Sequence, residues 1–224
     1  MPASVPAVYP LPLRAGCVLN LDMQDRGSRI LDHSGVGSHG LSYGSIPVAA
    51  PYGLARKLDG VDDYLSLGSN PKVAITGNAP RTIMCWANLA SSTKTNTLFS
   101  YGFMDTGRMV QFATMSFTGR LAVYMSGNDH ISNSVVPLNS WHLAAVVIFG
   151  TTSLLYLDGR LVSSRTNHTL IDTASSDVLI GVRFDGGVNT SFSGQIGIVQ
   201  VYDYALSAAE IEAACRENGW RYGA

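Results

Sequence analysis

The sequence predicts an all-β protein, an antiparallel β-sandwich of the jelly-roll type with one short helix at its C-terminal end. Short segments rich in β-branched and aromatic residues recur along the 224 residues at fairly even spacing. Glycines mark the turns between these segments, and one convincing helix signal follows the last of them. This combination is typical of a double-sheet sandwich, and a chain of this length commonly forms one such domain.

The first half of the chain alternates between strands and glycine-rich connections. Residues 17–23 predict the first strand, and a loop with glycines at 27, 35, 37, 40 and 44 follows over residues 25–44. Residues 58–65 predict a strand that enters a tight turn and leaves it again. Residues 81–89 predict a strand covered on both faces, because both sets of alternate side chains are apolar.

The second half continues the same pattern and adds a hairpin. We expect further strands at residues 97–103, 109–115, 121–125, 140–149 and 178–184, with a loop over 185–189. Asp158-Gly159 predicts a two-residue type I′ turn within 154–162. That turn pairs Leu157 with Arg160, Tyr156 with Leu161 and Leu155 with Val162.

The last strand and the helix follow one another directly. Residues 195–204 are mostly β-formers, and Ser207 with Glu210 three residues later fits a capping box. Leu206 and Ile211 have the spacing of a hydrophobic staple, and Asn218-Gly219 is typical of a helix end. A short single helix cannot bury its apolar stripe alone, so we expect it to cover part of a sheet.

The composition excludes some partners and suggests others. Only 14% of the residues are charged and the net charge is -1, without a basic stripe, so we expect no nucleic-acid partner. No apolar segment approaches the roughly 20 residues that span a membrane, so we expect no membrane partner. We favour burial of part of the surface by other protein subunits. The alternative is a polar surface of Gly, Ser, Thr and Asn.

The N-terminal segment predicts an assembly arm rather than a signal peptide. Residues 1–14 are interrupted by prolines and lack a basic region, so we expect synthesis in a cytoplasm. The segment is extended and apolar, and we expect it to dock onto its own domain or onto a neighbour. We expect a domain at 15–218 and a tail at 219–224. The proposed contact residues of the arm are Val5, Val8, Tyr9, Leu11 and Leu13.

Several motifs occur together between residues 15 and 218. They are DHSG at 32–35, LDGVDDY at 58–64, TIMCW at 82–86, WHLA at 141–144, LYLDG at 155–159 and the strand and helix within 194–211. In this order they resemble laminin G-like domains of the concanavalin A-like lectin/glucanase fold. The resemblance implies a jelly roll, but this fold hosts lectins, hydrolases and structural modules.

One departure from the family pattern concerns calcium. The resemblance implies acidic residues after the isoleucine of the terminal strand, where this chain has Gly197 and Ile198. Ca²⁺ therefore stays possible only through Asp22, Asp62 and Asp63, although this ion prefers six or more oxygen ligands. No other cofactor is expected. The 3 cysteines lie in apolar surroundings without metal-ligand spacing, which predicts buried thiols.

Enzymatic chemistry finds little support in the residues. Glycosidases need two carboxyl groups at a fixed separation, yet Glu occurs only at 210, 212 and 217, in or at the end of the helix. Asp62 and Asp63 are adjacent and would point to opposite faces of a strand, so turn formation is the favoured interpretation. We therefore expect no catalytic residues and no enzyme. His142 lies in a strand motif, where packing is favoured.

Binding is the remaining class of function. Tyr101, Phe103, Arg108 and Tyr124 could line the concave face of the sandwich, and Asn128, Asp129, His130, Asp185 and Asn189 could form its rim. Ordinary core packing and turn chemistry are the competing interpretations of these residues.

The leading hypothesis is a non-enzymatic surface module. Because the chain combines an apolar arm, low charge, an aromatic tail and no export signal, we expect a virion-surface protein, such as a bacteriophage capsid decoration or fibre component. It would be oligomeric, located on the virion and able to bind host glycans. The alternatives are a free extracellular carbohydrate-binding lectin and a glycoside hydrolase of the same fold.

Overall fold

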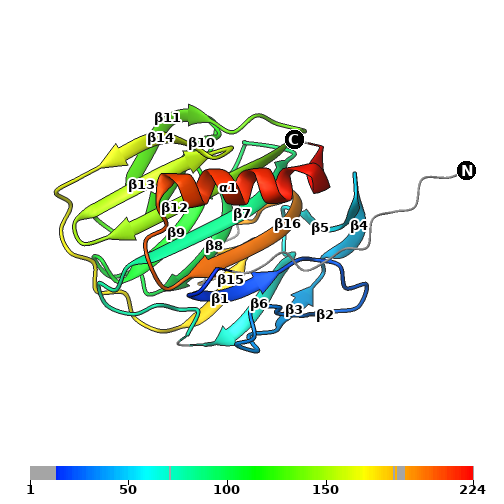
Figure 1. The fold of residues 1–224 in the computed structure, drawn as a ribbon, viewed down its shortest axis with the longest axis horizontal. Helices are drawn as coiled ribbons and strands as arrows, with labels where there is room; N and C mark the ends of the chain where they lie inside the picture. The colour runs from blue at the N-terminus through cyan, green and yellow to red at the C-terminus, as the bar shows by residue number, and fades with distance from the viewer. Residues whose placement is uncertain (1–13, 71, 184, 186–189, 224) are drawn as a thin grey trace, which may run out of the picture.

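The computed structural model describes residues 14–70, 72–183, 185 and 190–223 and confirms the all-β prediction. Two antiparallel sheets form a sandwich, and α1 (Ala208–Gly219) lies across one of them, followed by the short 3-10 helix η2 (Trp220–Tyr222) (Figure 1). None of the helices in the described part of the chain has the length and hydropathy of a membrane-spanning helix.

Sheet A, which lies under α1, has eight strands among the described residues. In spatial order they are β14 (Arg160–Arg165), β13 (Thr152–Leu157), β12 (Trp141–Phe149), β7 (Arg81–Leu89), β16 (Ser193–Tyr202), β5 (Gly53–Asp59) and β4 (Ile46–Ala50), with β1 (Cys17–Leu21) also paired to β16.

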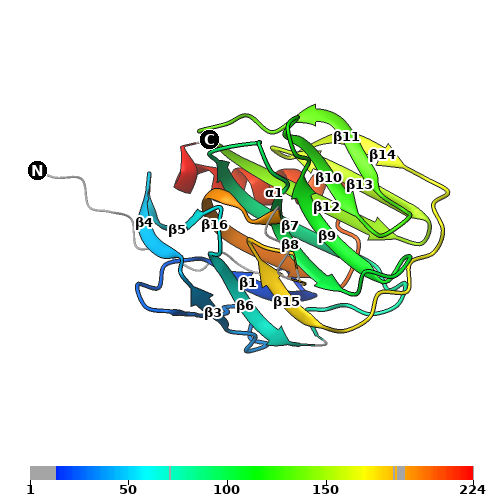
Figure 2. The same cartoon turned by 180° about the vertical axis from the view of Figure 1, so that it is seen from behind.

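Sheet B faces the viewer in Figure 2, with α1 behind it, and also has eight strands. Their order is β11 (His130–Val135), β10 (Arg120–Tyr124), β9 (Met109–Thr114), β8 (Asn96–Gly102), β15 (Asp177–Ile180), β6 (Tyr64–Ser69), β3 (Gly40–Tyr43) and β2 (Arg29–Ile30). The predicted loop at 25–44 therefore contains two short strands, because Arg29–Ile30 and Gly40–Tyr43 pair with each other.

The main core fills the space between the sheets. Ile83 and Cys85 of sheet A face Phe99 and Phe112 of sheet B, and all four side chains are buried. Cys17 is buried as well and Cys215 is half-buried, and all three thiols are free. Burial raises the pKa of the Cys17 thiol to about 11, and burial raises the pKa of the Cys85 thiol as well. The prediction of buried, unreactive thiols therefore holds for Cys17 and Cys85.

A second core lies between α1 and the outer face of sheet A. Trp86 is buried there against Tyr222, with the ring centroids 4.8 Å apart, and Ile211 of α1 belongs to the same cluster. The capping box is confirmed, because Ser207 Oγ accepts from Glu210 N at 3.3 Å and Ser207 N donates to Glu210 Oε2 at 2.8 Å. The helix covers the sheet as predicted.

The segment predicted as a separate tail belongs to this second core. Tyr222 is buried, and its hydroxyl accepts a hydrogen bond from Ile198 N at 2.8 Å. A Cβ atom at Gly197 would lie 2.3 Å from that hydroxyl oxygen. The glycine at this position, which departs from the family pattern, is therefore required by the tyrosine that packs over it.

The hairpin joining β13 to β14 follows the prediction except at one pair. Asp158 and Gly159 both have positive φ, as a type I′ turn requires, and Leu157 pairs with Arg160 and Tyr156 with Leu161. Leu155 pairs with Ser163 rather than with Val162, because a bulge shifts the register between Leu155 and Tyr156.

Candidate functional site

A hollow of about 370 Å³ lies on the outer face of sheet B. Its floor comes from β9 and β10, and its walls come from the connections between β7 and β8, β8 and β9, β10 and β11, and β15 and β16. The lining residues are Thr95, Met104, Met109, Gln111, Tyr124, Ser126, Gly127, Asp129, Arg183 and Thr190. This volume falls within the roughly 300–1,000 Å³ of small-molecule sites.

Strand alternation turns the floor residues outward. On β9, Val110 and Phe112 point into the main core, so Met109 and Gln111 point to the opposite face. Tyr124 of β10 is the direct cross-strand partner of Gln111. The Gln111 amide donates to Thr97 Oγ1 at 2.8 Å, which fixes its orientation, and the surrounding loops leave it only 3% exposed.

Charged groups stand in the walls of the hollow. Arg183 donates through Nε and Nη2 to the two carboxylate oxygens of Asp185, each at 2.7 Å, so its guanidinium is held in one orientation. Asp129 Oδ1 accepts from Met125 N at 2.9 Å. Burial and the charge of Asp129 raise the pKa of Tyr124, which keeps that phenol neutral as a hydrogen-bond donor and acceptor.

The predicted ligand-binding residues divide into four groups, of which the last is buried. Tyr124 and Asp129 line the hollow, and Asp185 orients Arg183 beside it. Phe103 and Arg108 are exposed on the adjoining turn between β8 and β9, where the guanidinium lies 5.8 Å from the ring centroid. Asn189 lies outside the described residues.

Tyr101, Asn128 and His130 are buried, so their assignment to an open binding face is corrected. Tyr101 is 1% exposed, and its hydroxyl contacts Arg81 Nη1 at 2.6 Å and Ile75 O at 3.0 Å. The cause is a bulge in β8 between Thr97 and Phe99. Thr97 faces outward beside Gln111, but the extra residue reverses the alternation and turns Tyr101 into the core.

His130 joins the two sheets at their edge. Its ring nitrogens contact the hydroxyls of Ser153 on β13 and Ser163 on β14, at 2.9 and 2.8 Å. Burial, followed by the charge of Arg165, lowers the pKa of His130 to about 4. The neighbouring Asn128 accepts from Thr169 N at 3.1 Å. Both side chains therefore hold the edge together.

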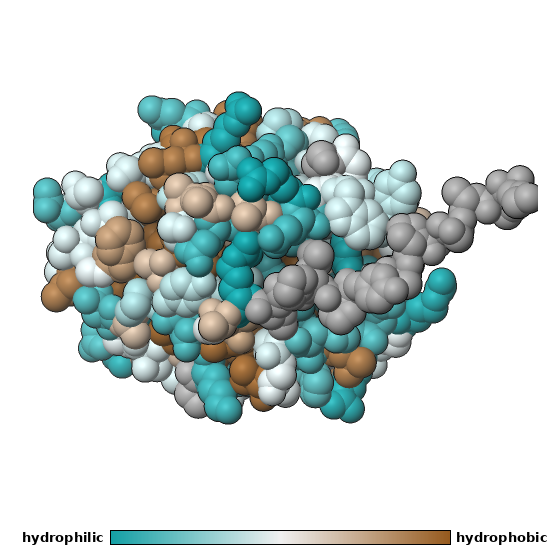
Figure 3. Space-filling model, in the orientation of Figure 1, coloured by the Kyte–Doolittle hydropathy of each residue, from teal (hydrophilic) through white to brown (hydrophobic). Residues whose placement is uncertain are grey.

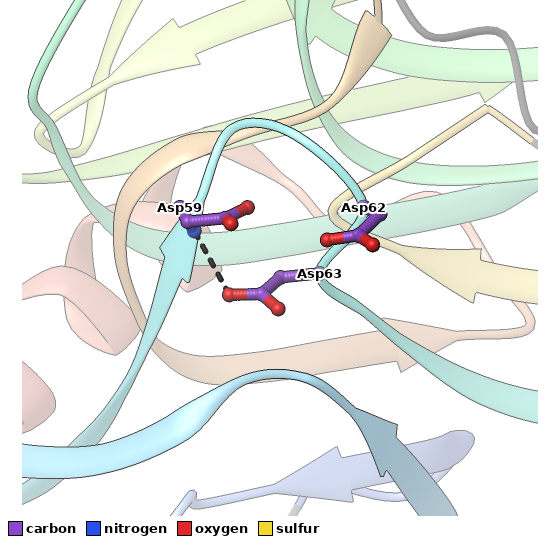
Figure 4. Close-up of side chains that lie close together, drawn as sticks. All are labelled: Asp59, Asp62 and Asp63. Atoms are coloured by element: carbon purple, nitrogen blue, oxygen red, sulfur yellow. Dashed lines mark hydrogen bonds between the residues drawn. The ribbon is translucent and has the colours of Figure 1, made fainter.

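The metal candidates are only partly brought together. Asp62 and Asp63 lie with Asp59 in the turn between β5 and β6, with one oxygen from each within 4.8 Å of the others (Figure 4). Asp22 is not part of this group and contacts His33 at 3.5 Å. Asp59 was not predicted as a metal ligand, because an Asp followed by Gly60 is typical of a turn.

The three aspartates fit calcium poorly. Asp59 Oδ1 accepts from Val61 N, and Asp63 Oδ2 accepts from Asp59 N at 3.0 Å, so two of the six carboxylate oxygens are already engaged. Burial and the charges of Asp59 and Asp62 raise the pKa of Asp63. With the four remaining carboxylate oxygens, a calcium ion here would need backbone oxygens or water to reach six or more ligands.

The DHSG motif has a structural role in the loop after β1. The Asp32 carboxylate accepts hydrogen bonds from Asn20 N, Ser34 N and Oγ, and Ser38 N, at 2.7 to 2.9 Å. These bonds lower the pKa of Asp32 despite its burial. The carboxylate thereby closes this loop and is not available for chemistry.

Comparison with known families identifies the fold family. Residues 59–212, more than half of the chain, match the Laminin_G_3 model, described as the concanavalin A-like lectin/glucanases superfamily. The chain belongs to this superfamily. No curated protein matches it. The resemblance stated from the motifs is thereby confirmed, and with it the jelly-roll architecture.

Solved structures share the fold at low sequence identity. Domain 4 of AbnA, an extracellular arabinanase from Geobacillus stearothermophilus solved with arabinotriose, matches with a TM-score of 0.72 and 17% identity over 89% of this chain and 98% of that domain. The binding domain of Paraclostridial Mosquitocidal Protein 1 matches with 0.72 and 15% over 90% and 52%. Trypanosoma rangeli sialidase with sialic acid matches with 0.70 and 16% over 92% and 34%. This superfamily chain thus spans about half of the second structure and a third of the last.

Proposed function

We propose that this chain is a non-enzymatic carbohydrate-binding module whose ligand site is the hollow on sheet B. The observation that carries the proposal is the mixture of groups in that hollow. A neutral phenol, a carboxylate, an oriented guanidinium and an amide surround one concavity, with Met104 and Met109 as apolar contacts. Sugars present hydroxyls that donate and accept hydrogen bonds, and they also present apolar ring faces. The polar groups of the hollow match the hydroxyls, and the two methionines match the ring faces.

The structural neighbours support the same class of ligand. AbnA domain 4 was solved with arabinotriose and the sialidase with sialic acid. These proteins share only the fold with this chain. They make a saccharide the first ligand class to test.

Absence of catalysis is part of the proposal, and the placement of the carboxyl groups supports it. Asp129 is the one carboxylate among the described residues that line the hollow, whereas glycosidases use two. The glutamates lie on α1, which covers the outer face of the opposite sheet. A glycoside hydrolase would need a second acid that the described lining does not provide.

A glycan array with the labelled full-length chain tests the proposal. We expect selective binding, and a loss of at least tenfold in affinity for the best glycan in Tyr124→Ala and in Arg183→Ala. Phe117→Ala is the matched control, because Phe117 is 83% exposed and lies outside the hollow. Binding of the variants at the wild-type level would contradict the assignment of this site.

The finer expectation of a virion-surface protein stays a prediction. It depends on the arm residues Val5, Val8, Tyr9, Leu11 and Leu13, which lie outside the described residues. None of the solved structures compared above is a capsid protein by its description. The solution mass of the full chain, compared with a form lacking residues 1–13, tests the assembly role: a monomer in both forms would contradict it.

A further inference from the structure

The outer face of sheet A is closed by α1 and η2 over only part of its width. Trp141 of β12 marks the boundary, because its ring centroid lies 4.5 Å from that of Tyr222. The next positions along the same cross-strand row are polar. Asn88 of β7 pairs with Trp141, Gln195 of β16 pairs with Asn88, and Lys57 of β5 pairs with Gln195. Directly opposed residues point to one face, so these side chains stand side by side.

Two hollows lie beyond this boundary. The first, of about 230 Å³, is lined by Lys57, Leu58, Asp59, Asn88, Ala90, Asn139, Ser193, Gly194 and Gln195. The second, of about 200 Å³, shares Asp59 and Ser193 with the first and continues past Lys94 and Asn96. Because they share two lining residues, the hollows adjoin each other, and together they are hereafter called the sheet A groove.

The groove contains side chains that the described residues leave without hydrogen bonds. Gln195 Oε1 is shielded from solvent and has no partner, although buried acceptors are normally satisfied. Lys57, Asn88 and Asn139 also form no side-chain hydrogen bond within the described residues. Gln111 in the sheet B hollow differs, because its amide is bonded to Thr97. The first hollow thus holds several polar groups whose hydrogen-bonding capacity is unused among the described residues, whereas Lys94, Asn96 and Ser191 of the second hollow are bonded.

We propose that the sheet A groove is a second saccharide-binding site, selective for a short neutral oligosaccharide. The first hollow offers amides from Asn88, Asn139 and Gln195, together with one ammonium and one carboxylate, whose charges balance. A neutral sugar can accept from the Lys57 ammonium and form hydrogen bonds with the amide groups of Asn88 and Asn139. Two adjoining hollows fit two or more consecutive sugar units.

The surface chemistry favours a saccharide over a protein partner. Protein interfaces concentrate binding energy in Trp, Tyr and Arg, none of which is among the described residues that line the sheet A groove. On the face seen in Figure 3, the coloured hydrophobic residues occur in small groups among hydrophilic ones.

The described lining of the sheet A groove shares no residue with that of the sheet B hollow, although Thr95 and Thr190 of that hollow are sequence neighbours of Lys94, Asn96 and Ser191 in the groove. To separate the two sites, the test uses the full chain carrying Tyr124→Ala and Arg183→Ala, which removes the sheet B hollow as a ligand site. Binding of arabinotriose, xylotriose, cellotriose and maltotriose, each at millimolar concentration, is measured by saturation-transfer NMR and calorimetry. We expect at least one trisaccharide to bind this double variant.

Adding Gln195→Met, which keeps the side-chain length and removes the amide, is expected to weaken that binding at least tenfold. Lys57→Met is expected to do the same, and because Lys57 is exposed and unbonded it serves if Gln195→Met fails to fold. Lys72→Met, at an exposed lysine outside both hollows, is the control and should change nothing.

The outcomes distinguish the two proposals. No trisaccharide binding by the double variant, or binding unaffected by both Gln195→Met and Lys57→Met, would overturn the sheet A site. If the parent chain binds glycans and the double variant binds none, the proposed function stands and this inference fails. If the double variant binds as well as the parent chain does, the sheet B assignment fails and the sheet A site remains.

Discussion

The outer faces of the two sheets differ in composition, and that difference decides which one is closed. On sheet A, Met84, Trp86, Leu143 and Ala145 are apolar and lie under α1 and η2. On sheet B, the corresponding outward positions include Thr97, Ser100 and Gln111, whose polar groups bond to neighbours. An apolar outer face requires a covering layer, whereas a polar one can be left to loops and ligands.

The largest effect should come from opening the closed face. Trp86→Ala removes the largest fully buried side chain beneath η2, and we expect the free energy of unfolding to fall by about 3 to 5 kcal/mol. Denaturant titration measures this loss. The control Phe117→Ala, at an exposed aromatic, should change stability by no more than about 0.5 kcal/mol. A loss in Trp86→Ala no larger than that in Phe117→Ala would mean that the second core contributes little to the free energy of unfolding.

The contact between the two sheets at His130 should make stability depend on pH. The unfolded chain binds a proton near pH 6.5, but the folded His130 does so only near pH 4. Protonation therefore favours the unfolded state, and this contribution is present above pH 6.5 and is lost as the pH falls to about 4. We expect a loss of at most about 3 kcal/mol.

Denaturant titrations at several pH values measure this dependence. His130→Gln should reduce the decline between pH 6.5 and 4 relative to the parent chain. An unaltered pH profile in His130→Gln would show that this histidine is not the group responsible.

A smaller effect is expected from the start of the covering helix. Ser207→Ala removes the side chain that accepts from Glu210 N, and we expect a loss of about 1 kcal/mol. Ser164→Ala on the exposed side of β14 is the control, since no hydrogen bond of its side chain is present among the described residues. A Ser207→Ala protein as stable as the parent would show that packing of α1, and not its cap, determines its position.

The smallest effect concerns the turn that links sheet A to sheet B. Because Asp59, Asp62 and Asp63 offer too few free oxygens, we expect Ca²⁺ to bind only weakly. At a concentration equal to its Kd, calcium would stabilise the fold by about 0.4 kcal/mol, and Asp59→Asn should abolish the effect. Thermal unfolding with and without millimolar calcium measures it. Strong stabilisation at micromolar calcium would reveal further ligands.

Local sequence signals predicted the elements whose stability is local. The capping box at Ser207 and Glu210 and the type I′ turn at Asp158-Gly159 appear in the structure because their hydrogen bonds and φ angles depend on a few adjacent residues. The pairs nearest that turn were also correct. The pair Leu155–Val162 was wrong because a bulge farther along the hairpin shifts the register.

The candidate site was predicted less completely, because it is formed by residues that are distant in the sequence. Tyr124 and Asp129 were predicted and line the hollow, but Gln111, Thr95 and Arg183 were missed, since nothing in their local sequence marks them. Tyr101 was placed on the wrong face because the bulge in β8 has no turn residue to announce it. The burial of His130 likewise depends on Ser153 of β13 and Ser163 of β14. These serines are distant from His130 in the sequence and contact it only in the folded structure.

The sequence alone therefore determined the sandwich, its family and the helix that follows the last strand, because strand periodicity, turn glycines and caps are properties of neighbouring residues. Only the tertiary structure decided which face α1 covers, why Gly197 must be small beneath Tyr222, and which polar side chains meet in each hollow. These features depend on register and on contacts between distant strands, and a single bulge is enough to move a side chain from one face to the other.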